Sequence, residues 1–350
     1  MKHIRIILCL TLFLTAASAA ARVRYTVNDA WRFTKGSPYN AFQPAADDSA
    51  WEVVNIPHTW NAEDAADDVP GFYRGPAWYR KRIVLPADAA SKQADLCFEG
   101  ANQVVRLYVN GHYAGKHTGG YTRFVFDITK YIVPGGENLF AVEVDNAHDP
   151  DIPPLSADFT FFGGIYRDVS LLLTDKVHVA PTDFGSPGVY LSTPEVTAER
   201  AAVEVRTLVA NSGTEPVRVR VEHRIVGPDG REAARAEDMA EIAAGSVAEQ
   251  LRRGITIASP RLWDIDEPNL YRVLTRIVTE DGRVLDEVSN PLGLRWFSFD
   301  PDKGFSLNGR PRKLVGTCRH QDYLGRGWAL PDEMHERDVR LIKEMGGNFL

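Results

Sequence analysis

Aromatic side chains stand beside hydroxyl-binding polar side chains in three segments: residues 56–61 followed by 73–75 and 78–81, residues 117–129, and residues 158–169. An aromatic ring can stack on the apolar C–H face of a pyranose, while Asp, Asn, His and Arg side chains bind its hydroxyl groups. The three segments are therefore candidate sugar-binding segments. The alternative is a core of aromatic residues joined by structural turns, which we expect for Trp51, Tyr79, Phe124 and Phe126.

No motif for self-contained catalysis accompanies these segments. The sequence has no glycine-rich phosphate loop after a predicted strand, no metal-binding His-x-x-x-His or Cys-x-x-Cys spacing, and no Gly-x-Ser-x-Gly elbow. The acidic run at residues 63–68 lacks the spacing of a calcium-binding loop, so a solvated loop is the simpler interpretation. The sequence thus predicts neither a metal site nor a cofactor.

The first twenty residues have the pattern of a secretory signal peptide. Lys2 and Arg5 form a basic start, residues 6–14 are apolar, and the small residues 17–19 form a cleavage site. The apolar run is too short to span a bilayer, which disfavours a signal anchor. We therefore expect a secreted protein without a membrane span, either periplasmic or extracellular.

Composition excludes two further classes of protein. The 40 Lys and Arg residues and 47 Asp and Glu residues give a formal net charge of −7, and removal of Lys2 and Arg5 makes it −9. Without a basic stripe, nucleic-acid binding is not expected. Cys97 and Cys318 are the cysteines beyond residue 20, and each is predicted to be a free buried thiol. A disulfide-dependent domain is therefore excluded.

Residues 24–174 read as a run of short strands separated by turns. Val105, Leu107 and Val109 alternate with polar residues, and Asn110-Gly111 is a strong hairpin signal. No long helical periodicity interrupts this pattern. About 150 residues of this kind predict a β-sandwich of the jelly-roll type.

Residues 177–296 show cleaner alternation, as in the series Val217, Val219 and Val221. Asp229-Gly230 is a hairpin turn of the same kind as the one above. Roughly seven strands over this length predict an immunoglobulin-like β-sandwich without cysteines. The Ala- and Glu-rich stretch 231–249 could form a helix, but we favour a strand and a loop.

Residues 299–350 change to the pattern of a βα unit. Residues 304–322 predict a hairpin that continues into a buried strand, and residues 332–345 predict a helix with Asp332 as its N-cap. Residues 348–350 then start a second strand. Such a unit belongs to a parallel α/β architecture, and in barrels the chemistry lies on loops after many strands. We therefore expect an N-terminal fragment whose catalytic apparatus lies mostly beyond Leu350.

Two motifs make a resemblance to a known family specific. They are Gly-Gly-Ile-Tyr-Arg-Asp-Val at 163–169 and Leu-Asn-Gly-Arg-Pro followed by Gly-Thr-Cys-Arg-His over 307–320. Together with the order of segments, they make the chain resemble glycoside hydrolase family 2, which contains β-galactosidases and β-glucuronidases. The resemblance implies a mainly β fold: a jelly-roll sugar-binding domain, an immunoglobulin-like domain and the first βα unit of a truncated (β/α)8 TIM barrel.

The resemblance also implies roles for a few residues. Asp158 matches an acid that reaches into the barrel mouth and binds the substrate sugar, and His320 matches a histidine that contacts the sugar at the cleavage subsite. Arg319 is expected mainly as an ion-pair partner within the barrel, and substrate binding is the alternative role for it. Asn61 is a candidate for a sugar-binding asparagine. Cys318 replaces the asparagine usual in the family, so this position departs from the family's substrate contacts.

The function implied is that of a retaining exo-β-glycosidase, most like a β-galactosidase, acting on β-linked oligosaccharides or glycosides. Its acid/base and nucleophile would be two glutamates on later barrel strands, so the 350-residue chain alone is expected to be inactive. The alternatives are a non-catalytic carbohydrate-binding protein and an adhesion protein of stacked sandwiches. Both are disfavoured by the βα pattern from residue 299 onward. The sugar and the oligomeric state stay open.

Overall fold

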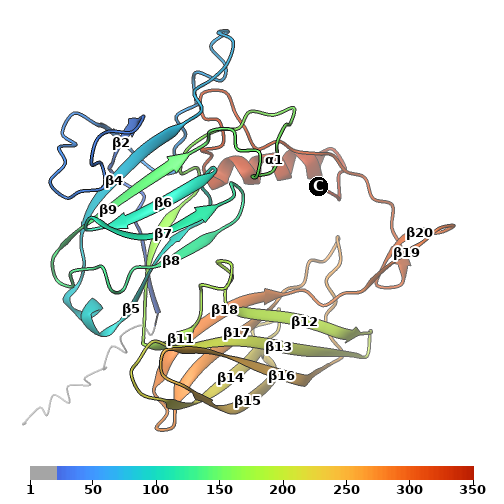
Figure 1. The fold of residues 1–350 in the computed structure, drawn as a ribbon. Coiled ribbons are helices and arrows are strands. Elements are labelled where there is room, and N and C mark those ends of the chain that lie inside the picture. The colour runs from blue at the N-terminus through green and yellow to red at the C-terminus, as the bar shows by residue number, and fades with distance from the viewer. Residues whose placement is uncertain (1–21) are drawn as a thin grey trace, which may run out of the picture.

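The computed structural model describes residues 22–350, so the expected signal peptide lies outside the described residues. Two β-sandwiches follow one another along the chain, and a C-terminal segment returns from the second to the first (Figure 1). The chain is mainly β, as expected from its sequence. Within residues 22–350, no helix is both long and apolar enough to cross a bilayer.

The first sandwich consists of two antiparallel sheets. The larger has the order β3 (Glu52–Val54), β2 (Trp31–Lys35), β4 (Pro76–Val84), β9 (Glu137–Asp145), β6 (Val104–Val109) and β7 (His112–Thr118). The smaller has the order β1 (Arg22–Thr26), β10 (Val169–Thr174), β5 (Gln93–Phe98) and β8 (Phe124–Asp127). A short 3-10 helix, Ala87–Ser91, precedes β5.

The alternation along these strands explains how the sandwich forms. Val105, Leu107 and Val109 are fully buried in the core, because successive side chains of a strand point to opposite faces. Asn110 and Gly111 both adopt positive φ, 53° and 85°, which closes the β6–β7 hairpin as predicted. The aromatic residues expected in the core are there: Tyr79, Phe124 and Phe126 in the main core, and Trp51 in a smaller outer cluster.

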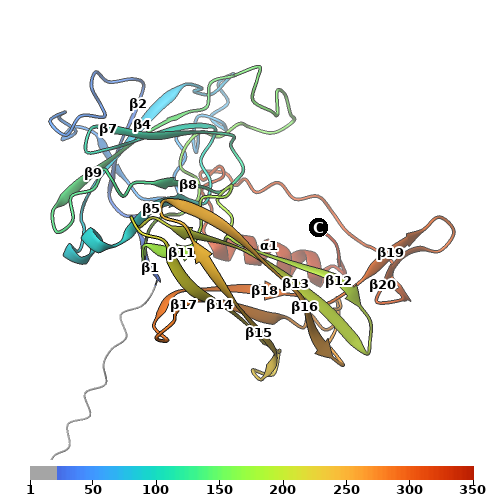
Figure 2. The ribbon, with the colours of Figure 1, turned by 60° about the horizontal axis from the view of Figure 1, so that its bottom comes forward.

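The second sandwich has two antiparallel four-stranded sheets (Figure 2). In one sheet, β13 (Arg200–Asn211) pairs with β11 (Val177–Val179), β12 (Val189–Val196) and β16 (Ser246–Ala258). The other sheet has the order β15 (Glu232–Ile242), β14 (Val217–Val226), β17 (Tyr271–Thr279) and β18 (Val284–Leu292). The Ala- and Glu-rich stretch lies in β15 and the start of β16, so the strand interpretation is confirmed.

The C-terminal segment begins with a small sheet of β19 (Phe297–Asp300), β20 (Gly304–Leu307) and β21 (Arg310–Pro311). It then returns to the first sandwich and forms the helix α1 (Asp332–Glu344), shown in red in Figure 1. An isolated parallel bridge joins Gly316 to Phe349 on either side of the helix. A strand, a helix and a parallel neighbour fit the start of a (β/α)8 barrel.

Three details of this segment differ from the sequence expectation. The segment after the hairpin is exposed rather than a buried strand, because within the described residues it joins no sheet and the Gly316–Phe349 bridge is isolated. For the same reason the Cys318 thiol is free but exposed, whereas Cys97 is free and buried as expected. Pro331 rather than Asp332 takes the N-cap position, without a side-chain capping bond, and Asp332 is the first helical residue.

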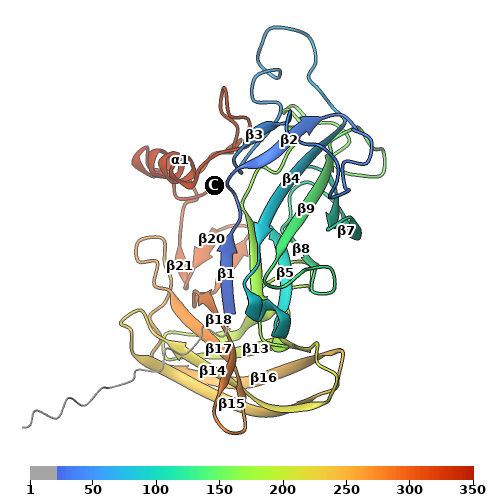
Figure 3. The same ribbon diagram turned by 90° about the vertical axis from the view of Figure 1, so that its left-hand side faces the viewer.

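An ion pair joins the two sandwiches. Arg22, at the start of β1, donates from Nε and Nη2 to the Asp286 carboxylate at 2.8 and 2.6 Å, and from Nη2 to the Val179 carbonyl. Asp286 is fully buried and also accepts from the Val179 backbone N–H at 2.7 Å. Figure 3 shows β1 running from the first sandwich toward the second, where this pair forms.

Removing one partner of this pair should be costly. We expect Arg22→Ala to lower the free energy of unfolding by about 3–5 kcal/mol, because it leaves the Asp286 charge buried without its counter-ion. Arg200→Ala is the matched control, since the Arg200–Glu195 pair is about half exposed, and it should cost less than about 1 kcal/mol. Urea unfolding measures both variants, and equal effects would contradict the assigned role of the pair.

A buried carboxyl group on the outer face of β5 gives a pH-dependent prediction. Burial, and then the neighbouring Asp127 carboxylate, raise the pKa of Asp95 to about 7, and its Oδ2 has no hydrogen-bond partner among residues 22–350. Because the folded state holds this proton more tightly than the unfolded state, stability should fall as pH rises from about 4 to about 7. Asp95→Asn should therefore raise the melting temperature at pH 8 and much less at pH 4.

Thermal unfolding at both pH values tests this expectation. Asp302→Asn is the matched control, because Asp302 is an exposed carboxylate on the β19–β20 turn. A stabilisation by Asp95→Asn that is the same at pH 4 and pH 8 would show that the Asp95 proton does not contribute.

Candidate functional site

A hollow of about 250 Å³ lies where the C-terminal segment meets the first sandwich. Trp328 forms its base, being 5% exposed and packed against Tyr166 and Phe162 at ring-centroid separations of 5.3 and 5.5 Å. These aromatic contacts bring together loops that are far apart in the sequence. The lining residues are Tyr121, Phe159, Arg319, His320, Gln321, Asp322 and Trp328.

Two of the predicted site residues lie at this hollow or beside it. The exposed His320 ring stands edge-on to Phe159, with centroids 6.0 Å apart and an interplanar angle of 79°. Asp158 directly precedes Phe159, is exposed, and makes no hydrogen bond or ion pair with another described residue. The structure therefore presents an accessible imidazole against the Phe159 ring and an accessible carboxylate on the residue that precedes Phe159.

Arg319 is held by an ion pair rather than facing freely into the hollow. Its Nε and Nη2 donate to Oδ2 of Asp338 at 2.8 and 2.7 Å. Asp338 also accepts a hydrogen bond from the Tyr323 hydroxyl, and the Tyr323 and Arg319 bonds together lower the pKa of the Asp338 carboxyl. Because Asp338 belongs to α1, this pair ties the loop that carries His320 to the helix.

Asn61 lies in a different environment. Its side chain is fully buried, donates to the Asp64 carboxylate and to the Tyr73 carbonyl at 3.0 Å each, and accepts from the Gly163 N–H at 2.8 Å. All its bonding positions are filled by protein groups. This geometry favours a structural role, in which Asn61 joins loop 61–75 to loop 146–163, over sugar binding.

The rest of the first candidate segment also belongs to the interior. Trp60 is 5% exposed, and a Cβ on Gly163 would lie 2.0 Å from its ring, so only glycine allows this approach. Burial and the positive charge of Lys35 lower the pKa of His58 to about 4, and its Nδ1 lies 2.8 Å from the Tyr79 hydroxyl. His58 is therefore neutral at pH 7 and structural.

Two residues near the hollow had no assigned role from the sequence. Trp328 anchors the C-terminal segment, and a tryptophan in the Gly-rich loop 325–328 was the available signal. Arg74 lies over the Phe161 ring, with its guanidinium carbon 4.9 Å from the centroid. Within residues 22–350, no three His, Cys, Asp or Glu side chains gather closely enough to hold a metal ion.

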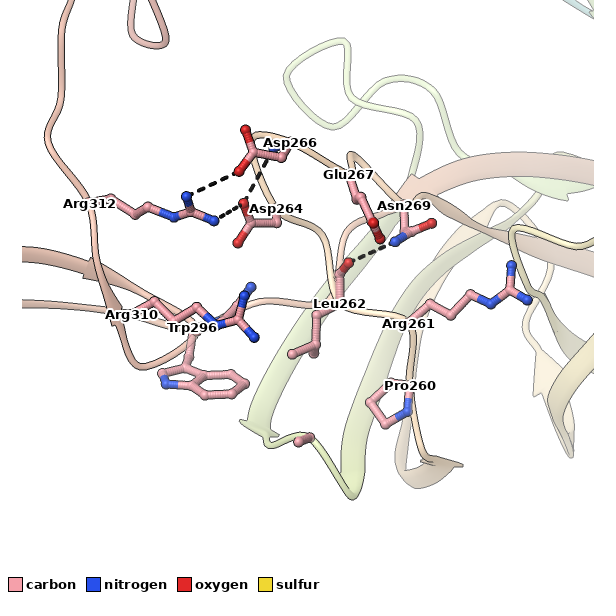
Figure 4. A pocket seen from close by; sticks show the side chains of 12 residues that line it. Pro260, Arg261, Leu262, Asp264, Asp266, Glu267, Asn269, Trp296, Arg310 and Arg312 are labelled. Carbon is pink, nitrogen blue, oxygen red and sulfur yellow. Dashed lines mark hydrogen bonds and ion pairs between the residues drawn. The ribbon is translucent and has the colours of Figure 1, made fainter.

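A larger hollow, of about 740 Å³, lies between the second sandwich and the β20–β21 hairpin (Figure 4). Arg312 crosses it to Asp264 at 2.6 Å and to Asp266 at 3.1 Å, so these two carboxylates are already paired. None of the predicted site residues lines it. Its size alone does not make it the functional site. The smaller hollow is the better candidate, because it is lined by the imidazole of His320 and by aromatic rings.

Comparisons with known proteins agree with this organisation. The model of the glycosyl hydrolases family 2 sugar binding domain matches residues 28–175, and the model of glycosyl hydrolases family 2 matches residues 189–295. A β-glucuronidase of Bacteroides fragilis is 38% identical over 85% of this chain and 42% of its own length. A β-galactosidase of Bacteroides ovatus is 33% identical over 95% of this chain and 39% of its own.

The fold of this chain also matches that of solved structures. The crystal structure of a Bacteroides uniformis β-glucuronidase superposes with a TM-score of 0.90 and 42% identity, covering 94% of this chain and 39% of that one. The chain therefore spans about two fifths of the length of these relatives.

The buried bonds of Asn61 lead to a prediction about stability. Asn61→Ala should lower the free energy of unfolding by at least about 2 kcal/mol, because the Gly163 N–H and the Tyr73 carbonyl lose their hydrogen-bond partner inside the protein. Glu63→Ala, at an exposed position of the same loop, is the control and should change little. If urea unfolding shows Asn61→Ala to be as stable as the control while sugar affinity falls, Asn61 belongs to the binding site instead.

Proposed function

The chain belongs to glycosyl hydrolase family 2, and from this premise we propose that it is the N-terminal part of a secreted, retaining exo-β-glycosidase. The substrate class is a β-linked glycoside. The sequence resemblance favours a galactoside, while the relatives include both β-galactosidases and β-glucuronidases, so a terminal galactose or glucuronate is proposed.

One observation supports this proposal most directly. The loop of the first sandwich that carries Asp158 meets His320 of the C-terminal segment across Phe159, whose ring lies 6.0 Å from the imidazole. Carboxylate, imidazole and aromatic ring are the groups that bind sugar hydroxyls and stack on a sugar face. A position after the first strand of a barrel is also where active-site side chains emerge.

In the proposed mechanism, these residues orient the sugar and do not perform the chemistry. A retaining glycosidase uses two carboxyl groups about 5–5.5 Å apart, one as acid/base and one as nucleophile, through a glycosyl-enzyme intermediate. We propose that both are glutamates located beyond residue 350. Asp158 and His320 would hold the terminal sugar so that its anomeric carbon faces the nucleophile, which contributes through orientation.

The competing function is a secreted carbohydrate-binding protein without catalysis. It explains the two sandwiches and the aromatic hollow but gives no reason for a βα unit with the parallel bridge between Gly316 and Phe349. The relatives are glycoside hydrolases, and each extends well beyond the matched part. Both observations favour the glycosidase.

Kinetics of the full-length gene product test the proposal. We expect Asp158→Ala and His320→Ala each to lower kcat/KM on an aryl β-galactoside or β-glucuronide by about 100-fold or more, because the sugar loses its orientation. Asp151→Ala is the matched control, since Asp151 is exposed in the same loop as Asp158. Melting temperatures should not change.

The kinetic results distinguish a glycosidase from a carbohydrate-binding protein. Near-normal kinetics in either variant would remove that residue from the site. A wild-type protein that binds such glycosides but hydrolyses none of them would support the carbohydrate-binding function instead.

A further inference from the structure

Arg74 is a half-buried arginine whose charge is not balanced by a partner in the part of the chain that the structure describes. Most other half-buried arginines are paired with carboxylates, as Arg319 is with Asp338 and Arg22 with Asp286. Asp64, in the same loop as Arg74, accepts from Asn61 and the Tyr73 N–H and faces Lys35 at 3.9 Å instead. Its carboxylate is therefore engaged elsewhere.

The Arg74 guanidinium is nevertheless held in place. Its Nε donates to the Asn146 carbonyl at 2.8 Å, and its plane lies over Phe161 with the central carbon 4.9 Å from the ring centroid. Asn146 is itself fully buried, accepting from the Gly75 N–H at 2.9 Å and donating to the Phe161 carbonyl at 3.0 Å. Nε and one face are thus occupied, while Nη1 and Nη2 make no hydrogen bond within residues 22–350.

A guanidinium fixed in this way is suited to one class of ligand. Its two terminal nitrogens form a planar fork that matches the paired oxygens of a carboxylate or a sulfate. Preorganisation by stacking and by the Nε bond reduces the conformational entropy lost when such a group binds. A neutral hydroxyl group would use one nitrogen and leave the charge unbalanced.

The position of Arg74 relates it to the hollow. Phe161 lies 5.3 Å from Phe159, and Phe159 lies 6.0 Å from His320, measured between ring centroids. We call this row of two phenylalanine rings the aromatic ledge. It leads from the imidazole at the proposed cleavage subsite to the guanidinium. Tyr121 lines the same hollow, and its burial raises the pKa of its hydroxyl group. The positive charge of Arg74 acts in the opposite direction and lowers this pKa.

We propose that Arg74 binds the carboxylate or sulfate group of an acidic sugar unit that follows the unit held at His320 along the aromatic ledge. This inference rests on the proposed glycosidase function and narrows its substrate class to acidic oligosaccharides. Arg74 is a specificity-determining residue in this scheme, since it contacts the leaving part of the substrate and not the reacting atoms.

Binding of non-hydrolysable probes tests the proposal on the full-length gene product. The probes are sulfur-linked disaccharides with galactose or glucuronate as the first unit and a second unit that is neutral, carboxylated or sulfated. Calorimetry should show that at least one acidic probe binds about tenfold or more tightly than its neutral counterpart, because a charge-assisted fork is formed. Added salt should weaken binding of a probe with an acidic second unit more than binding of its counterpart with a neutral second unit. The carboxylated and sulfated arms identify which oxyanion the site takes.

Variants at Arg74 complete the test. Arg74→Gln should lose the preference for the acidic probe while keeping its affinity for the neutral one, and Arg74→Lys should keep only part of it, because lysine carries the charge without the fork. Arg32→Gln is the matched control, since Arg32 is another half-buried arginine without an ion pair within residues 22–350. Arg32 donates to the Trp51 carbonyl and does not line the hollow.

Several results would overturn the inference. They are equal binding of acidic and neutral probes by the wild-type protein, binding of no probe, or an unchanged preference in Arg74→Gln. Hydrolysis of aryl glycosides distinguishes this failure from failure of the proposed function. If the protein cleaves aryl glycosides but shows no preference for acidic probes, only the inference about Arg74 is wrong. If it cleaves no aryl glycoside, the proposed function is wrong.

Discussion

The packing of Trp328 against the first sandwich is the contact on which the arrangement of the site depends. Segment 312–331 belongs to no sheet of the described residues, and only isolated bridges, such as Gly316–Phe349, join it to its neighbours. Trp328 fixes its course through ring contacts with Phe162 and Tyr166, and Gly327 comes so near Phe162 that a Cβ there would lie 2.5 Å from the ring. The positions of Arg319 and His320 follow from this anchor.

Hydrogen bonds and ion pairs set the positions of the loops, which apolar packing of the two cores does not specify. The two sandwich cores stabilise the fold without specifying how one loop meets another, because apolar burial is non-directional. The pairs that set loop positions are buried and polar: Arg22 with Asp286 between the sandwiches, and Asn61 and Asn146 beneath loop 146–163. Such groups bond at few angles and are costly to leave unpaired, so each allows one arrangement of its neighbours.

Features that depend on local sequence were predictable. Side-chain alternation predicted the strands of both sandwiches, and the helix expected at 332–345 is observed at Asp332–Glu344. Features that depend on distant partners were not. Asn61 looked like a polar residue available to a sugar, but its side chain is bonded to Asp64, Tyr73, Asn146 and Gly163. Cys318 was expected to be buried because the hairpin at 304–322 was predicted to continue into a buried strand, but burial of a strand requires neighbouring strands.

The division of labour between the two parts of the site has a physical reason. Arg74, Asn146 and Phe161 all lie within the first sandwich, and their contacts with one another are complete without the C-terminal segment. The Arg74 guanidinium is therefore held in place by the first sandwich alone, which favours recognition of one shape and charge. On the proposed function, the barrel would supply the reacting carboxylates. Changes in the sandwich loops would then alter which glycan is accepted while the chemistry of bond cleavage stays the same.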